Sequence, residues 1–255
     1  MTDKFATMEY VWLYMKALLL AAGKGSRLRP LTNTIPKCLV KIGGKPIIQH
    51  WFEKLHEVGC RDFIINTHYL APLVSEFVEN YKKINSDIKI EVSFEKELLG
   101  TAGTFREHMH KLCGEINFVL HVDNYTPEGL DKLMHAHIKK QPECLLTMMT
   151  FSSSTPSECG VLLINEKNVM IDYKEKVKDP PSTVANSAIY IFDNAFVDWC
   201  NESKNACNAS DISNDIIPLL LGRVQTWHSD KFFQDIGTYD GLMSARNHHS
   251  KFISK

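Results

Sequence analysis

The chain has 255 residues, of which 44% are hydrophobic and 23% charged, and its formal net charge is −1. This length suits one large α/β domain or two small ones, and the balanced charge argues against a surface that coats nucleic acid or an anionic membrane. Seven cysteines without a C-x-x-C pair favour reduced thiols over a disulfide framework or a zinc site, which indicates a cytoplasmic protein.

An apolar stretch near the N-terminus resembles the core of a signal peptide. Tyr10–Ala22 is rich in apolar residues, but Lys16 interrupts it and acidic residues precede it. No segment reaches the roughly 18 to 20 uninterrupted apolar residues that a membrane span needs. We therefore expect residues 1–14 to be an N-terminal extension and residues 15–255 to form a single domain.

Strand and helix patterns alternate through the first part of the chain. Apolar runs predict strands at Lys16–Ala22, Asp62–Thr67, Ile88–Phe94, Asn117–Val122 and Cys144–Phe151. Helical periodicity predicts helices at Ile47–Val58, at Leu73–Lys82, from the Glu97–Gly103 loop to Leu112, and at Glu128–Lys140. This order predicts an α/β fold with a Rossmann-like, mainly parallel twisted sheet flanked by helices, and ligands beyond the carboxyl ends of the strands.

The second half of the chain changes character. Short polar turns join predicted strands at Gly160–Ile164, Val169–Lys174 and Val184–Phe192, which indicates antiparallel additions to the sheet. The expected order ends with helices at Asn194–Asn201 and Ser213–Leu221, a strand near Val224–Ser229 and a terminal helix from Thr238.

A glycine-rich basic loop follows the first strand. Gly23 and Gly25 allow backbone N–H groups to turn inward and approach a ligand closely. Positive charge around the loop comes from Lys24, Arg27, Arg29 and Lys37. Because a polyphosphate requires such charges, the loop predicts a cradle for a nucleoside triphosphate.

Two familiar glycine-rich motifs do not fit this loop. A dinucleotide-binding turn needs a third glycine where Leu28 stands, and a P-loop needs its lysine after the second glycine, whereas Lys24 lies between the two. The run from Gly23 to Thr32, followed by Pro36-Lys37, instead resembles the G-x-G-[ST]-R-[LM]-x-P-L-T…P-K signature of the sugar-1-phosphate nucleotidylyltransferases. The resemblance covers nearly all of residues 15–247.

The resemblance implies transfer of a nucleotidyl group from an NTP to a sugar 1-phosphate, with release of pyrophosphate, by Mg²⁺-assisted in-line attack at the α-phosphate. In motif the chain is closest to guanylyltransferases that use mannose or heptose 1-phosphate, so GTP is the expected nucleotide. Residues of about 15–125 would form the nucleotide half and those of about 126–247 the sugar-phosphate half. The oligomeric state is left open.

The same resemblance implies roles for individual residues. Arg27 would contact the β- and γ-phosphates and Lys37 the α-phosphoryl group, as the catalytic residues, while Asp123 and Asp235 would hold Mg²⁺. The implied nucleotide-binding residues are Leu20, Ala21, Ala22, Gly23, Lys24, Gly25, Ser26, Glu97, Gly100, Thr101, Ala102 and Gly103. The implied sugar-phosphate-binding residues are Gly160, Glu175, Lys176 and Asn186.

Two threonines are expected to cap helices: Thr101 the helix that follows the Glu97–Gly103 loop, and Thr238 the terminal helix. Asn66–Leu70 is expected to be a βα connection at the crevice, although contact with the base is an alternative. We expect His248-His249 to lie in a polar tail.

The sequence departs from the family pattern at four positions. Val122 and Ala188 replace glycines, Cys159 replaces an aromatic residue and Val177 replaces a proline. Two alternatives therefore stay open. One is a cytidylyltransferase acting on a non-sugar phosphate, which the Pro36-Lys37-Cys38 variant suggests. The other is a catalytically silent homologue that binds a nucleotide sugar and regulates a partner.

Overall fold

The computed structural model describes residues 15–112, 114 and 116–253, so the proposed extension over residues 1–14 lies outside the described residues. The described chain forms two compact units, each made of segments that are separate in sequence. We call them the β1 unit (Ala17–Leu98, His121–Gly129 and Lys231–Lys255) and the β11 unit (Leu99–Leu120 and Leu130–Asp230, with the described residues before Ala17).

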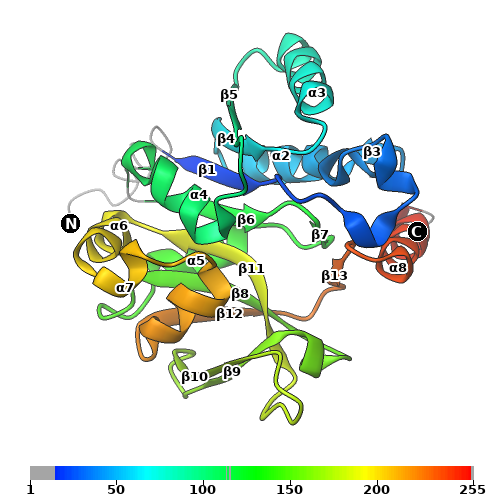
Figure 1. The fold of residues 1–255 in the computed structure, drawn as a ribbon. Helices are drawn as coiled ribbons and strands as arrows, with labels where there is room; N and C mark the ends of the chain where they lie inside the picture. Colours follow the sequence, from blue (N-terminus) through cyan, green and yellow to red (C-terminus); the bar gives the residue numbers. More distant parts are fainter. Residues whose placement is uncertain (1–14, 113, 115, 254–255) are drawn as a thin grey trace, which may run out of the picture. The chain divides into compact units, whose positions relative to one another are not determined.

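The β1 unit contains the parallel pair β4–β5 and the helices around it (Figure 1). Its strands are β1 (Lys16–Leu20), β2 (Lys41–Ile42), β3 (Lys45–Pro46), β4 (Asp62–Thr67), β5 (Lys89–Phe94), β7 (Asn124–Tyr125) and β13 (Gln234–Asp235). Its helices are α2 (Ile47–Glu57), α3 (Ala71–Ile84) and α8 (Tyr239–Ile253), with 3₁₀ turns at Ser26–Leu28, Leu31–Asn33 and Lys37–Leu39. Strands β1, β4 and β5 are neighbours in that order, and β4 and β5 run parallel.

Aromatic packing holds the β1 unit together. Trp51 and Phe52 of α2 are buried, and the ring of Phe52 lies 5.2 Å from that of Phe63 in β4 and 5.1 Å from that of Tyr81 in α3. Burying one such side chain stabilises a fold by about 1.5–3 kcal/mol. These contacts fix helices α2 and α3 on the strands whose carboxyl ends carry the site described below.

The β11 unit is mostly antiparallel (Figure 1). Its strands are β6 (Asn117–His121), β8 (Leu146–Ser152), β9 (Gly160–Ile164), β10 (Met170–Glu175), β11 (Val184–Phe192) and β12 (Val224–Ser229). Its helices are α4 (Gly100–His108), α5 (Asp131–Ile138), α6 (Asn194–Glu202) and α7 (Lys204–Cys207), with 3₁₀ turns at Met109–Lys111, Pro156–Glu158 and Ile217–Leu220 and a π-helical turn at Ile212–Ile216. Strand β11 pairs antiparallel with β6, β8 and β9, whereas β12 pairs parallel with β8.

The α/β fold class is confirmed, with parallel pairing in the first part of the chain and antiparallel strands in the second. None of the helices in the described part of the chain is long and apolar enough to cross a membrane. The helix expected at Glu128–Lys140 begins three residues later, at Asp131. The helix expected at Ser213–Leu221 is wrong: Pro218 has no N–H to continue an α-helix, and the segment divides into a π-helical and a 3₁₀ turn.

The expectation of a polar tail at His248-His249 is also wrong. Both residues belong to α8, where His249 Nδ1 lies 2.8 Å from the hydroxyl of Tyr125 and the His248 ring stacks on Phe232 at 4.1 Å. His50 completes this histidine–aromatic cluster, with its ring 5.5 Å from that of His249. Aromatic partners from distant segments thus bring the terminal helix onto the unit.

Candidate active site

The carboxyl ends of β1, β4 and β5 are joined by one buried asparagine. The Ala21 N–H donates to Asn66 Oδ1 (2.7 Å), and Asn66 Nδ2 donates to Glu95 Oε1 (2.9 Å). His68 Nδ1 lies 2.9 Å from the Glu95 carbonyl oxygen. Asn66 therefore fixes the start of the glycine-rich loop, a role that neither the expected βα connection nor its alternative, contact with the base, included.

The glycine-rich loop is anchored again at its second glycine. Gly25 has a φ of +62°, and the hydroxyl of Thr32 donates to its carbonyl (2.7 Å). A Cβ at Gly25 would lie 2.9 Å from Thr32 Cγ2 and 3.2 Å from Lys37 Cβ, so both conformation and space require glycine. Gly23, Lys24 and Arg27 of the loop are exposed, while Ala21 and Ala22 are buried.

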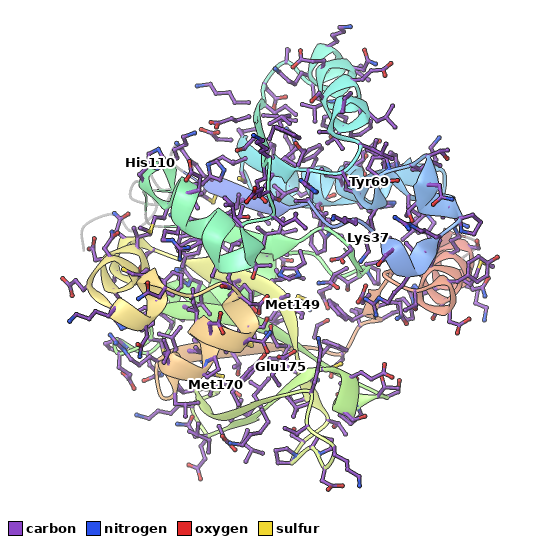
Figure 2. All side chains as sticks on the ribbon, viewed as in Figure 1. Lys37, Tyr69, His110, Met149, Met170 and Glu175 are labelled. Atoms are coloured by element: carbon purple, nitrogen blue, oxygen red, sulfur yellow. The ribbon has the colours of Figure 1, made fainter. Side chains whose placement is uncertain are left out.

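Four charged residues from distant positions converge in the β1 unit. Lys37 (labelled in Figure 2) is buried and forms an ion pair with Asp123; its Nζ also lies 3.7 Å from Asp235 Oδ1. Arg27 Nη2 lies 3.9 Å from Asp235 Oδ2. The structure thus brings together the two residues expected to contact phosphates and the two expected to hold a metal.

Backbone pairing positions the two carboxylates. Asp235 of β13 pairs with Asn124 of β7, and the Ile236 N–H donates to the Asp123 carbonyl (2.9 Å). Trp51 Nε1 donates to the carbonyls on either side of Asp123, those of Val122 (3.1 Å) and Asn124 (3.0 Å). The Val122 side chain is itself buried, so the residue that replaces a family glycine is part of the core.

Gly237 makes room for this charged cluster. Its N–H donates to Asp235 Oδ1 (2.5 Å), and a Cβ at this position would lie 2.8 Å from Lys37 Nζ and 2.9 Å from Arg27 Nη2. Any larger residue would push these cations away, so the space beside them requires glycine at this position. Thr238 caps α8 as expected, because its hydroxyl accepts the Gly241 N–H (3.1 Å).

The electrostatics of the cluster favour the charged form of Asp123. Burial alone would raise the pKa of Asp123, but the positive charge of Lys37 and the neighbouring His121 outweigh burial and hold that pKa below its usual value. Asp235 is half exposed. The site therefore presents two carboxylates and two cations at the end of a strand pair.

These carboxylates fit a divalent cation. Mg²⁺ takes oxygen ligands and is usually bound by one or two carboxylates together with substrate phosphates and water. Within the ranges that the structure describes, no group of three or more His, Cys, Asp or Glu residues could hold a metal. A cation at Asp123 and Asp235 would hence need further oxygens from a phosphate or water.

The Gly100–Gly103 motif lies on the β11 unit and differs from the expected loop. Helix α4 begins at Gly100, Leu99 precedes it, and the Thr101 side chain does not cap it. Thr101 Oγ1 instead donates to Asp211 Oδ2 (3.0 Å) and accepts the Ile212 N–H (2.8 Å). The capping role expected of Thr101 is therefore wrong.

Packing within the β11 unit explains the first glycine of this motif. Gly100 has a φ of +75°, and a Cβ there would collide with the Ser210 carbonyl oxygen. The Ala102 N–H donates to that same oxygen (3.1 Å). Glu97 lies before the motif, exposed, in the β1 unit.

The residues expected to bind the sugar phosphate gather in the β11 unit. Glu175 (labelled in Figure 2) ends β10, and its partner across the strand pair is Gly160. Asn186 lies on β11, and both its amide and Glu175 contact the hydroxyl of Tyr173. Lys176 has a φ of +49° and an exposed side chain, whose Nζ lies 3.6 Å from Glu175 Oε1.

An irregularity in β11 aims Asn186 into this group. Between Asn186 and Tyr190, three residues of β11 face a single residue of β8, which makes a β-bulge. Ala188 in the bulge has a φ of +54°, and its N–H donates to Asn186 Oδ1 (2.8 Å). Ala188 thus adopts the backbone conformation that a glycine would adopt more readily.

Comparison with known proteins finds one family that matches most of the chain. The family described as nucleotidyl transferase matches residues 16–251. The chain is 30% identical over 246 residues to a mannose-1-phosphate guanyltransferase of Yarrowia lipolytica, and the match covers 94% of this chain and 66% of that protein. It is 31% identical over 240 residues to the mannose-1-phosphate guanyltransferase of Saccharomyces cerevisiae, and this match covers 91% of this chain and 63% of that protein.

The chain thus spans less than two thirds of the length of either relative. Among solved structures, a Bacillus anthracis protein described as a glucose-1-phosphate thymidylyltransferase, crystallised with sucrose, is similar in fold. Its TM-score is 0.80 at 22% sequence identity, and the match covers 92% of this chain and 95% of that one.

Proposed function

Since this chain belongs to the nucleotidyl transferase family, we propose that it transfers a nucleotidyl group from an NTP, with GTP favoured, to a sugar 1-phosphate and releases pyrophosphate. The observation that carries the proposal is the convergence of Arg27, Lys37, Asp123 and Asp235 beside the glycine-rich loop. The relatives' names support guanylyl transfer to mannose 1-phosphate.

The proposed chemistry needs charge compensation more than a nucleophilic side chain. The sugar phosphate oxygen is already anionic, so it attacks the α-phosphorus directly and the bond to pyrophosphate breaks, without a covalent enzyme intermediate. The protein must overcome repulsion between two polyanions and hold the attack in line. Preorganised cations in a partly buried site reduce this repulsion and hold the phosphates in place, because the cations need no rearrangement as negative charge develops.

Each of the two cations in the cluster, Lys37 and Arg27, has a proposed part. Lys37 is held by Asp123 and directed toward Asp235, and it stabilises the charge on the α-phosphoryl group. Arg27, mostly exposed on the loop, binds the β- and γ-phosphates and the leaving pyrophosphate. Mg²⁺ at Asp123 and Asp235 would supply further neutralisation of the phosphate oxygens. The loop residues from Leu20 to Ser26 would cradle the triphosphate with their backbone N–H groups.

The β11 unit has the proposed acceptor residues. Glu175 hydrogen-bonds the sugar, Asn186 and Gly160 line the same subsite, and Lys176 binds the incoming phosphate. Glu175, Asn186 and Gly160 are buried or hydrogen-bonded, which fits a defined polar subsite for the sugar. Lys176 is exposed, which fits a point charge that binds the phosphate of the incoming sugar 1-phosphate. Glu97 in the β1 unit and Gly100–Gly103 at the start of α4 are each proposed to contact the nucleotide base.

Pyrophosphate release tests the proposal. GTP, CTP, UTP, dTTP and ATP are each offered with Mg²⁺ and a panel of sugar 1-phosphates and phosphocholine-like acceptors. We expect turnover with GTP and a hexose or heptose 1-phosphate. Turnover only with CTP and a non-sugar acceptor would replace the substrate assignment, and binding of a nucleotide sugar without any turnover would favour a regulatory homologue.

Removing the buried cation gives the sharpest variant. Lys37→Met should lower kcat by about 100- to 1,000-fold, the cost of removing one preorganised group from a transition-state site. Lys41→Met removes an exposed lysine from the nearby β2 and is the matched control, for which we expect near-normal turnover. Asp123→Asn and Asp235→Asn should both lose activity and weaken its dependence on Mg²⁺ concentration. Equal turnover in Lys37→Met and Lys41→Met would contradict the assigned role.

A further inference from the structure

The proposed reaction gives no role to the buried hydroxyl of Tyr173. Tyr173 lies on β10, two residues before Glu175, and its hydroxyl donates to Glu175 Oε2 at 2.5 Å. Asn186 Nδ2 lies 3.4 Å from the same hydroxyl and 2.6 Å from the hydroxyl of Tyr190. Ser213 joins the group, with its Oγ 3.3 Å from both Asn186 Nδ2 and the Tyr190 hydroxyl.

The direction of the Tyr173 hydrogen bond is fixed by its surroundings. Burial, then the neighbouring Tyr190 and Glu175, raises the pKa of Tyr173, so the phenol keeps its proton. A phenol has one proton to donate, an ionised carboxylate only accepts, and the Asn186 amide nitrogen only donates. The proton of Tyr173 therefore goes to Glu175, and Asn186 supports the phenol oxygen from the other side.

Space around Gly160 confirms that this pair is built into the fold. Gly160 faces Glu175 across the β9–β10 pair, and a Cβ at this position would collide with the Tyr173 hydroxyl and with Glu175 Oε2. The glycine thus accommodates the tyrosine–glutamate pair. Glu175 keeps its other oxygen, Oε1, on the side of the exposed Lys176 Nζ, 3.6 Å away.

We propose that Tyr173 determines acceptor specificity by occupying one of the two Glu175 oxygens, so that Glu175 accepts a hydrogen bond from one sugar hydroxyl and not from a vicinal pair. A free carboxylate offers two oxygens and can accept from two neighbouring hydroxyls at once. The phenol donates to Oε2, and Gly160 packs against the same oxygen, so Oε1 is the oxygen that remains for the acceptor. This inference rests on the proposed function for its substrate, a sugar 1-phosphate.

The experiment counts the hydroxyls that Glu175 binds. The acceptor is the sugar 1-phosphate that supports turnover, or mannose 1-phosphate if none does, together with its monodeoxy analogues at each ring position. Both kcat/KM and the calorimetric Kd are measured for the wild type, Tyr173→Phe, Glu175→Ala and the double variant. A hydroxyl counts as bound to Glu175 when its deletion weakens binding about tenfold or more with Glu175 present and little without it.

We expect one such hydroxyl in the wild type and two adjacent ones in Tyr173→Phe, because the phenylalanine frees Oε2. Tyr81→Phe, a half-buried tyrosine on α3, is the control and should keep the wild-type profile. A merely structural role for Tyr173 would weaken all analogues equally, and an unchanged count would overturn the inference. Two adjacent hydroxyls in the wild type would overturn it without any variant.

The outcomes separate this inference from the proposed function. Turnover with an unchanged hydroxyl count keeps the function and rejects the inference. Absence of turnover with every NTP rejects the function, while the calorimetric count still decides the inference. If no sugar 1-phosphate binds at all, Glu175 has no acceptor hydroxyl to select and the inference fails as well.

Discussion

Replacing Ala188 by glycine should stabilise the protein, because this residue adopts a left-handed backbone conformation in the β11 bulge. Its φ is +54°. For an L-residue that conformation costs about 1–2 kcal/mol, which glycine avoids. Glycine in turn gives the unfolded chain more freedom, worth about 0.4–1 kcal/mol in the opposite direction. The difference predicts a net gain of about 0.5–1 kcal/mol in the free energy of unfolding.

Urea unfolding measures this gain as a higher transition midpoint with an unchanged m-value. Ala185→Gly is the matched control on the same strand: Ala185 is fully buried and is not among the residues with positive φ. We expect that variant to lose about 1 kcal/mol or more, since glycine weakens a strand and the buried methyl group is removed. If Ala188→Gly were destabilised as much as Ala185→Gly, the strain assigned to the bulge would be refuted.

Two further predictions concern the histidine–aromatic cluster of the β1 unit. Gly43→Ala should destabilise the protein by about 1–2 kcal/mol or more in urea unfolding, because φ is +58° and the new Cβ would collide with the His249 ring. The control is Gly44→Ala, where φ is +83° but the space around the Cβ is open, so the loss of stability should be clearly smaller. Stability should also fall as the pH drops below about 6.5, since burial lowers the pKa of His50, His248 and His249, so the unfolded chain binds more protons than the folded one. Urea unfolding between about pH 7.5 and 5.5 checks this, and a His249→Phe variant with an undiminished pH slope would contradict it.

Local patterns predicted the secondary structure well. The strands at Asp62–Thr67, Gly160–Ile164 and Val184–Phe192 have the predicted bounds, because each is an apolar or alternating run that ends at polar turn residues. The Ser213–Leu221 helix failed because a proline outweighed apolar periodicity. The division into a nucleotide half and a sugar-phosphate half stays a prediction.

The candidate site depended on information that a local pattern does not contain. Residue types near the glycine-rich loop predicted a polyphosphate site, but the contacts that Asn66 and Gly237 make there were not predicted, because their partners lie far along the chain. Thr101 was misassigned for the same reason: its partner, Asp211, is 110 residues away. The roles of the site residues in catalysis stay predictions until variants are measured.

The two anchors of the glycine-rich loop have an entropic consequence. Asn66 holds the Ala21 amide and Thr32 holds the Gly25 carbonyl, so only a short span between them is left to be ordered. Fixing one residue's backbone costs about 1–2 kcal/mol in conformational entropy. A loop already fixed at both ends loses little of that freedom when it closes on a ligand, so more of the energy of each new contact appears as affinity.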